Sequence, residues 1–298
     1  MHDTGMTTIP PAEQMSAVDL DQARKILSTV SDASLNPSPN ISRVQLLKSL
    51  LGPELSRRMG VYEIPEGFKL SVVIPVYNEF KTIEKVIERV RNTGLPCEMV
   101  IVDDGSKDGT RDVLSRLRDE EAAANPDLRI IFHEKNQGKG AALRTGFQHC
   151  TGDVVVVQDA DMEYDPQDFR LLLQPLVEDR ADVVYGSRFS HNDGVVLSYW
   201  HQWGNQLITR LSNWKSGRSL TDVETCYKMI RRHLIQEIGP TLKEKGFGIE
   251  LELTFKLARK PGVRFFERPI SYAGRSYADG KKIGWRDGVW AMWCILTY

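Results

Sequence analysis

The chain has 298 residues, of which 41% are hydrophobic and 27% are charged, with 23 glycines and 14 prolines. This composition excludes collagen-like, disulfide-rich and wholly disordered proteins, and the length predicts one large domain or two small ones. The four cysteines are more than 50 residues apart and form no CxxC or Cys/His cluster, which argues against structural zinc and against a disulfide framework. We therefore expect a globular protein of a reducing compartment.

The net charge of −1 conceals an uneven distribution of charge along the chain. Residues 1–184 carry 21 Lys and Arg against 30 Asp and Glu, whereas residues 185–298 carry 18 against 10 and also contain all six tryptophans. Basic residues mixed with Trp suit a nucleic acid, an anionic membrane surface or a phosphorylated ligand. The basic third has no RNP, helix-turn-helix or zinc-finger signature, so we expect no nucleic-acid partner.

The hydropathy of the chain bears on its location. No stretch reaches the ~20 apolar residues that span a bilayer, and the N-terminus lacks the basic and apolar regions of a secretory signal. The sequence therefore predicts a cytoplasmic protein without a transmembrane helix, in which any membrane contact is peripheral.

Residues 1–66 contain clusters of Ser, Asn and Pro, with helical patterning at 15–29 and 41–59, and are predicted to be an accessory extension. From Lys69 onward, short apolar runs alternate with amphipathic segments. This alternation predicts an α/β fold with a mostly parallel central sheet covered by helices on both faces, so 67–298 is expected to form the main domain. Strands are predicted at 70–76, 99–102, 128–132, 154–157 and 183–185, and helices at 79–91, 110–123, 138–150 and 167–178.

The alternation fails after Gly186. A helix is predicted near 200–214, another at 249–259, and a strand at 263–267. The last segment, 283–298, has the pattern of an amphipathic helix rich in Trp.

Acidic residues follow several of the predicted strands, at the sheet edge where open α/β folds bind ligands. Asp159 and Asp161 follow a run of four valines, and alternate residues at a strand end point the same way, so both carboxylates can address one hard cation. Mg²⁺ or Mn²⁺ held in this way keeps positions open for a diphosphate. A solvated acidic turn is the alternative interpretation of the pair.

Two other segments suit a nucleotide. The turn Asp103-Asp104-Gly105-Ser106 offers a carboxylate to a ribose or a base, although Asp and Gly are also common in plain turns. The glycine-rich segment 136–140, which includes Lys139, opens a helix whose backbone N–H groups and dipole favour an anion, and a plain loop-to-helix junction is the alternative. The segment matches neither a P-loop nor a complete GxGxxG pattern, which argues against kinase and hydride-transfer activity.

The basic third offers cations for phosphate groups in Arg188, Arg275 and Lys281, because arginine in particular binds phosphate bidentately. Solvated surface cations remain the alternative for each of them. The six histidines have no metal-binding spacing and accompany no evident nucleophile, so a hydrolase triad has no support.

Taken in order, these motifs resemble the family 2 glycosyltransferases of the GT-A fold, and within them the dolichol-phosphate mannosyltransferase and polyprenyl-phosphate sugar transferase group. The resemblance covers about residues 69–290. The matching segments are 71–79 (SVVIPVYNE), 102–110 (VDDGSKDGT), 136–140 (NQGKG), 159–161 (DAD), 186–189 (GSRF) and Arg275 through Lys281.

The resemblance implies roles for individual residues. Asp159 would lie along the sugar diphosphate and Asp161 would bind the metal, with Asp159 and Glu163 as further ligands. Arg188, Arg275 and Lys281 would contact donor or acceptor phosphates. The donor would be held by Pro75, Tyr77, Glu79, Val102, Asp104, Lys139 and Ala160.

The implied reaction is inverting transfer of a hexose from a nucleotide diphosphate sugar, of the GDP-mannose or UDP-glucose type, to a polyprenyl or dolichyl phosphate. Such a phosphate is already anionic, so positioning and charge stabilisation would dominate catalysis. A hydroxyl acceptor, as in cell-envelope polysaccharide synthesis, would instead need a carboxylate base, for which Asp222 and Glu224 are the candidates. A nucleotide-sugar-binding protein without turnover is the third alternative.

Many proteins of this group carry C-terminal transmembrane helices, whereas 283–298 is too short to span a bilayer. Its tryptophans, with the neighbouring Lys281, Lys282 and Arg286, suit the interface of an anionic membrane. Packing of this helix against the core of its own domain is the alternative.

Overall fold

The structure is a computed structural model that describes residues 43–122, 125–189, 199–274 and 285–298. The chain divides into two units, of which the first ends at Tyr62 and the second begins at Glu63, whereas the predicted boundary lay after residue 66. The described part of the first unit contains α2 (Arg43–Arg58), interrupted where Gly52 adopts a φ of +72° before Pro53. The predicted helix at 15–29 lies outside the described residues.

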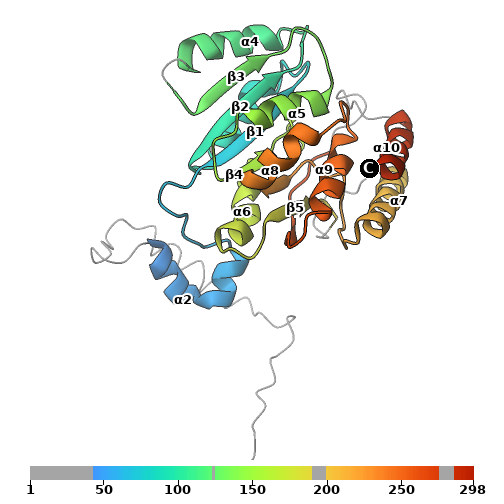
Figure 1. Cartoon of the computed structure of the whole chain (residues 1–298). Coiled ribbons are helices and arrows are strands. Elements are labelled where there is room, and N and C mark those ends of the chain that lie inside the picture. The colour runs from blue at the N-terminus through green and yellow to red at the C-terminus, as the bar shows by residue number, and fades with distance from the viewer. Residues whose placement is uncertain (1–42, 123–124, 190–198, 275–284) are drawn as a thin grey trace, which may run out of the picture. The chain divides into compact units, whose positions relative to one another are not determined.

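The second unit, Glu63–Tyr298, is built on a seven-stranded sheet with the order β3-β2-β1-β4-β6-β5-β7 (Figure 1). Strands β1 to β4 are parallel neighbours, β6 runs antiparallel to both β4 and β5, and β7 is parallel to β5. The strands are β1 (Leu70–Val76), β2 (Cys97–Asp103), β3 (Leu128–Phe132), β4 (Val154–Val157), β5 (Val183–Ser187), β6 (Lys228–Arg231) and β7 (Phe265–Pro269).

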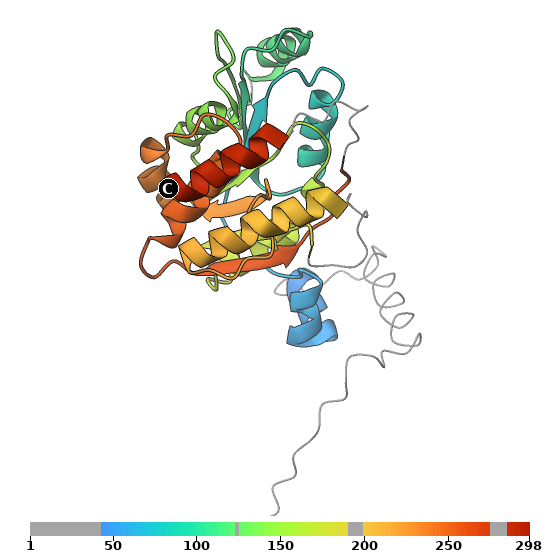
Figure 2. The same ribbon diagram turned by 90° about the vertical axis from the view of Figure 1, so that its right-hand side faces the viewer.

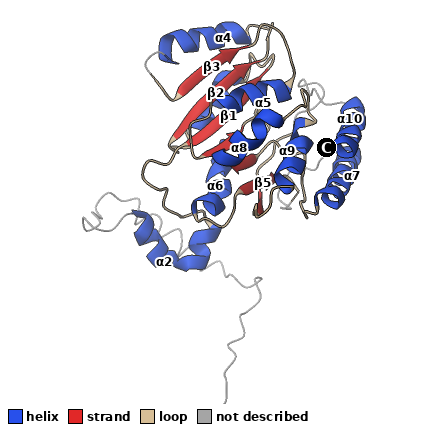
Figure 3. Ribbon diagram, viewed as in Figure 1, coloured by secondary structure: helices blue, strands red, loops and turns tan. Residues whose placement is uncertain are grey.

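Helices cover both faces of this sheet, as the alternating pattern predicts. Helices α5 and α8 lie over one face and α3 over the other (Figures 1 and 2). Figure 3 shows the strands as one layer between these helices. The helices are α3 (Ile83–Arg91), α4 (Thr110–Leu117), α5 (Lys139–Gln148), α6 (Phe169–Val177), α7 (Tyr199–Ser216), α8 (Arg232–Ile238), α9 (Ile249–Ala258) and α10 (Trp285–Thr297), with a π-helical turn at Arg118–Ala122 and 3₁₀ turns at Pro166–Asp168 and Gly239–Thr241.

The continuous apolar runs correctly predicted the positions of the central strands, because strands buried on both faces of a sheet consist of such runs. All four residues of β4 are no more than 1% exposed. The N-terminus of α3 differs from the prediction: the helix begins at Ile83 rather than at 79, since Asn78 has a φ of +53° and residues 78–80 are hydrogen-bonded to the loop after β2.

Strand β6 and helix α8 were not predicted from the sequence. Strand β6 has only four residues and begins with the buried charged residue Lys228, so it lacks the run of apolar residues that identified the other strands. Its direction matters for the site, because an antiparallel strand brings its first residue to the edge where the parallel strands end. The segment 222–228 therefore lies at the same sheet edge as the ends of β1, β2, β4 and β5.

None of the helices in the described ranges is long and apolar enough to cross a membrane.

Helix α5 begins in close contact with the backbone of residues 244–245. The N–H of Gly140 donates to the carbonyl of Lys245 at 2.7 Å, and a Cβ on Gly140 would lie 2.3 Å from the carbonyl oxygen of Glu244. A Cβ on Gly138, which has a φ of +97°, would lie 2.2 Å from the carbonyl oxygen of Lys245. Glycine at these positions therefore lets the start of α5 approach the loop before α9.

We expect Gly140→Ala to lower the free energy of unfolding by about 1–3 kcal/mol, because backbone atoms must move to admit the methyl group. Gly204→Ala is the matched control, since Gly204 is also helical and has no neighbouring atom within 4 Å of its Cβ position. The control is expected to gain up to about 1 kcal/mol from better helix propensity. Chemical denaturation of both variants measures the difference, and equal effects would contradict the packing argument.

Candidate active site

The loops after β1 and β2 are joined by hydrogen bonds at the carboxyl edge of the sheet. The N–H of Asn78 donates to Ser106 Oγ, and the N–H of Lys107 donates to Asn78 Oδ1, both at 2.9 Å. The N–H of Glu79 donates to Thr110 Oγ1 at 2.9 Å. The two loops thus form one rigid wall of the site.

The residues predicted to hold the donor nucleotide lie on this wall. Pro75 and Val102 are register partners on β1 and β2, and Tyr77 and Glu79 follow directly after β1. Glu79 is largely buried and accepts a hydrogen bond from Thr82 Oγ1 at 2.8 Å. The structure therefore brings these four residues to one place, as the resemblance implies.

Asp104 anchors the segment that precedes α5. Its Oδ2 accepts the N–H of Gly138 at 2.7 Å, its Oδ1 accepts the N–H of Gln137 at 2.9 Å, and the same Oδ1 lies 2.7 Å from His133 Nδ1. The other ring nitrogen of His133 lies 2.9 Å from Thr145 Oγ1. Both carboxylate oxygens of Asp104 accept hydrogen bonds from the segment before α5, so Asp104 holds this segment in place. Contact between Asp104 and a nucleotide remains a prediction.

A chain of buried ion pairs lies behind the predicted metal-binding loop. Lys139 Nζ is 2.8 Å from Asp159 Oδ1 and 3.2 Å from Glu250 Oε1, and Glu250 Oε2 is 2.6 Å from Lys228 Nζ. The four residues come from α5, the end of β4, α9 and β6. Burial alone would lower the pKa of Lys139, but Asp159 and Glu250 raise it well above its ordinary value, so this lysine remains charged.

Lys139 and Asp159 were predicted site residues, whereas Lys228 and Glu250 were not. A signal for both was present in the sequence, because Lys228 lies between the apolar residues Tyr227 and Met229, and Glu250 follows Ile249 at the start of an apolar helix. A charged residue inside an apolar run is buried only when it has a partner. That partner could not be identified without the fold.

The loop after Asp159 contains the other two predicted metal ligands. Asp161 Oδ1 accepts the N–H of Glu163 at 3.1 Å, and Glu163 Oε2 accepts the hydroxyl of Tyr272 at 2.7 Å. Since Asp159 is turned to Lys139 and Glu163 to Tyr272, the three carboxylates are not gathered together. Within the described ranges, no group of three or more His, Cys, Asp or Glu side chains is arranged to hold a metal ion.

This arrangement still fits a divalent cation that binds together with a substrate. Mg²⁺ is commonly held by one or two carboxylates, with phosphate oxygens and water completing its shell. Asp161, partly exposed at the strand edge, provides one such carboxylate. The donor set in the chain is therefore suited to a cation that arrives with a diphosphate.

Arg188 follows β5 and is fixed by Asp222. Arg188 Nε and Nη2 donate to the two oxygens of Asp222 at 2.6 and 2.8 Å, and the guanidinium carbon lies 5.3 Å from the centre of the Tyr272 ring. Asp222 is fully buried, and Asn205 Nδ2 on α7 is 3.5 Å from its Oδ1. Asp222 therefore serves as the partner of Arg188, which makes it a poor proton acceptor for a substrate.

Glu224 differs from the other acids of the site. It makes no ion pair or hydrogen bond with the described residues. Burial first of all, with Asp222 and Glu250 nearby, raises its pKa to about 7 against the opposing effect of Arg188 and Lys228. The two cations that act on it, Arg188 and Lys228, are already paired with Asp222 and Glu250. Glu224 is thus a carboxyl group without a cation of its own among the described residues.

Ala160 lies between the two aspartates and is 4% exposed. Arg275 and Lys281, the remaining predicted phosphate ligands, lie outside the described residues. Among the described residues that precede that segment, the hydroxyl of Tyr272 donates to Glu163 Oε2 and the N–H of Ala273 donates to the carbonyl of Glu163, in the loop after β4.

The sequence profile of the family described as Glycosyl transferase family 2 matches residues 71–239, more than half of the chain. An undecaprenyl-phosphate mannosyltransferase of Micrococcus luteus is 29% identical over 226 residues, which cover 72% of this chain and 88% of the relative. An undecaprenyl-phosphate 4-deoxy-4-formamido-L-arabinose transferase of Pectobacterium carotovorum is 34% identical over 218 residues, covering 71% of this chain and 62% of that protein.

Solved structures agree in fold. Glucosyl-3-phosphoglycerate synthase of Mycobacterium tuberculosis, in complex with UDP, superposes with a TM-score of 0.57 at 19% identity over 88% of this chain and 84% of that one. Mannosyl-3-phosphoglycerate synthase of Rubrobacter xylanophilus gives a TM-score of 0.57 at 18% identity over 81% of this chain and 73% of that one. Together with the sequence matches, these likenesses show that the chain belongs to glycosyl transferase family 2 and is a glycosyltransferase with the GT-A fold.

Proposed function

We propose that this glycosyltransferase transfers a hexose from a nucleotide diphosphate sugar to a polyprenyl phosphate, with Mg²⁺ or Mn²⁺ as cofactor. The relatives of similar sequence are named for transfer to undecaprenyl phosphate. A solved structure of the same fold, the M. tuberculosis synthase, contains Mn²⁺ and UDP. Both observations concern other proteins, and they support the acceptor and the cofactor that we propose for this chain.

The observation that carries the proposal is the convergence of acids and fixed cations at one sheet edge. Lys139 is paired with Asp159, and Asp161 lies two residues after Asp159 in the loop that follows β4. Arg188 directly follows β5 and is held by Asp222. This pairing uses two of the five N–H donors of a guanidinium, which leaves others for a phosphate. Such pre-oriented charges suit a reaction between two phosphate-bearing substrates.

In this reaction an oxygen of the acceptor phosphate attacks the anomeric carbon, and the bond from that carbon to the donor diphosphate breaks. The nucleoside diphosphate leaves with the electron pair, and inversion follows from the single displacement. The acceptor oxygen is already deprotonated near neutral pH, so the chain has no proton to remove. Positioning of the two phosphate groups is then the main contribution of the residues at the site.

A divalent ion bound with the donor would offset the charge that develops on the leaving diphosphate. Asp161 is the residue we assign to hold it. Arg188 is the residue we assign to orient a phosphate, and Asp222 keeps that guanidinium in place.

A second candidate function is transfer to a hydroxyl acceptor, and Glu224 favours it. A carboxyl group with a pKa near 7 and no partner among the described residues has the properties of a general base that works near neutral pH. Lipid-phosphate transfer does not need such a group, so the kinetic effect of Glu224 separates the two functions.

The proposal is tested by incubating the protein with a panel of GDP- and UDP-sugars, polyprenyl phosphate and Mg²⁺ or Mn²⁺. We expect a glycolipid that requires the metal, and a loss of about 100-fold or more for Asp161→Asn. Asp165→Asn is the matched control, because Asp165 lies in the same loop but caps a 3₁₀ turn through the N–H of Gln167. Donor hydrolysis without glycolipid would refute the acceptor, and equal loss in both variants would refute the metal assignment.

The second prediction concerns Glu224→Gln. If a hydroxyl is the acceptor, kcat falls by about 100-fold or more, and the rise of the wild-type rate through pH 7 disappears, because the ionised carboxylate is the active form. If polyprenyl phosphate is the acceptor, kcat changes little and the pH profile is retained. Steady-state rates between pH 5.5 and 9 with each acceptor distinguish these results.

The raised pKa itself is checked without activity. Between pH 4.5 and 7 the native state holds a proton on Glu224 that the unfolded chain has released, so this group lowers the free energy of unfolding as the pH rises. Relative to wild type, Glu224→Gln should therefore gain about 2–3 kcal/mol of stability from pH 5 to pH 8. A constant difference in denaturation free energy across this range would show that the pKa is ordinary.

A further inference from the structure

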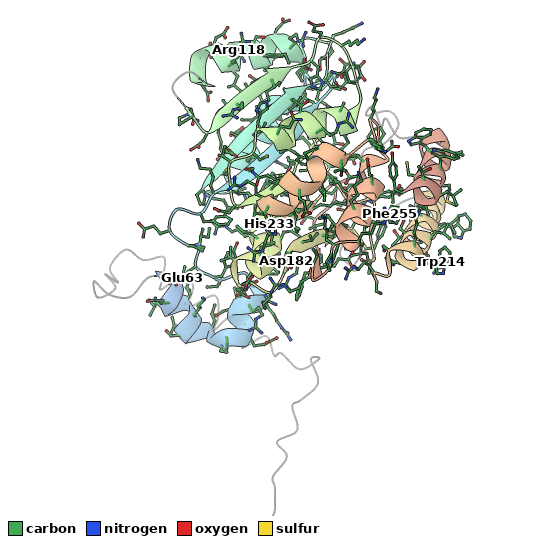
Figure 4. The ribbon with its side chains drawn as sticks, viewed as in Figure 1. Glu63, Arg118, Asp182, Trp214, His233 and Phe255 are labelled. Atoms are coloured by element: carbon green, nitrogen blue, oxygen red, sulfur yellow. The ribbon has the colours of Figure 1, made fainter. Side chains whose placement is uncertain are left out.

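Two helices of the second unit expose large apolar side chains on one side of the molecule. Helices α7 and α10 pack against each other and run side by side across the face seen in Figure 2. Trp214 on α7 is 85% exposed and projects away from the fold (Figure 4), and Leu296 on α10 is 77% exposed. We call this surface the α7/α10 face; its exposed apolar residues are Trp203, Leu207 and Trp214 on α7 and Val289, Trp290, Trp293 and Leu296 on α10.

The spacing of these exposed residues shows that they form a continuous apolar stripe along each helix. Trp203, Leu207 and Trp214 follow the helical spacing of four and seven residues, as do Val289, Trp293 and Leu296. The opposite sides of both helices are buried, through Asn205, Ile208, Thr209 and Ser212 on α7 and Ala291, Cys294 and Ile295 on α10. The fold therefore holds both helices firmly, while their outer stripes remain exposed in the described part of the chain.

The charges on α7 have one sign. Residues 203–216 of α7 contain Arg210 and Lys215 and no acidic residue, whereas α10 begins with one basic and one acidic residue, Arg286 and Asp287, and residues 288–298 contain no charged side chain. Arg210 is exposed within the apolar stripe of α7. An apolar surface with Trp and basic residues has the composition of a segment that lies in the interface of an anionic bilayer.

The face is also one helix away from the candidate active site. On the inner side of α7, Asn205 lies 3.5 Å from Asp222, the partner of Arg188. Helix α9, which packs on both α7 and α10, contributes Glu250 to the buried ion pairs. Since a helix with its side chains is about 10–12 Å across, a bilayer against this face would lie close to Arg188.

We propose that the α7/α10 face docks on an anionic phospholipid bilayer and so presents Arg188 to the headgroup region where a lipid phosphate lies. The purpose of the docking rests on the proposed polyprenyl-phosphate acceptor, whereas the docking itself rests on the surface. The outer stripes enter the interface without crossing it. A second copy of the chain is a less suitable occupant, because a two-fold contact would bring the exposed Arg210 of each copy into an apolar contact without an acidic partner on α7.

Vesicle flotation of the full chain tests the docking. The protein is mixed with vesicles of phosphatidylcholine alone or of phosphatidylcholine with phosphatidylglycerol, and the bound fraction is measured. We expect binding to the anionic vesicles that weakens with salt, and at least a tenfold lower partition coefficient for the combined variant Trp203→Gln, Leu207→Gln, Trp214→Gln and Trp293→Gln. Trp290 is left unchanged because its indole N–H donates to Glu244 Oε2 at 3.0 Å.

The matched control replaces exposed apolar residues elsewhere, by Leu50→Gln and Met59→Gln. This control should float like wild type, and circular dichroism with thermal melting confirms that both variants fold. Equal flotation of the two variants, or no flotation of wild type, would overturn the docking. So would a dimer in sedimentation analysis that the face variant alone dissociates.

Transfer to a detergent-dispersed polyprenyl phosphate separates the docking from the proposed function. Because this acceptor needs no bilayer, the face variant should transfer sugar to it as wild type does, while losing at least tenfold with the same acceptor in anionic vesicles. Flotation without transfer to either form would leave the docking intact and refute the acceptor. Transfer in detergent by a protein that does not float would leave the function intact and refute the docking.

Discussion

The buried pairing of Lys139 with Asp159 and Glu250 is the constraint on which the arrangement of the site depends. Lys139 is the first residue of α5, where the helix dipole disfavours a cation, and its side chain is largely shielded from solvent, where an unpaired charge is costly. Two carboxylates from distant parts of the chain offset both effects. Removal of either one would leave a buried charge without its full compensation, so the pairing fixes α5, β4 and α9 relative to one another.

The same pairing sets the shape of the substrate side of the sheet. The start of α5 must approach the loop before α9 closely enough for Lys139 to reach Glu250, and Gly138 and Gly140 make that approach sterically allowed. Asp104 then holds the preceding loop through the backbone N–H groups of Gln137 and Gly138. The loop after β2 and the Asp159 loop are therefore coupled through one short segment, although they are far apart in sequence.

The sequence predicted the parts of the fold that depend on local pattern. Continuous valine and isoleucine runs located β1 and β4 because burial on both faces requires such runs. The pattern did not locate β6, whose Lys228 is stabilised by Glu250 from a segment more than 20 residues away. Nor did it separate Asp222 from Glu224 as candidate bases, since only the fold pairs Asp222 with Arg188 and leaves Glu224 without a cation of its own among the described residues.

Helix α7 connects the two surfaces that a lipid-modifying glycosyltransferase would need. Its inner side contacts the Arg188–Asp222 pair through Asn205, and its outer side exposes Trp203, Leu207 and Trp214. A soluble acceptor would give no reason for such a stripe, because exposed tryptophans on a rigid helix increase the risk of aggregation. An acceptor whose phosphate lies at a membrane surface gives that reason, since the site then has to be held within about one helix diameter of the bilayer.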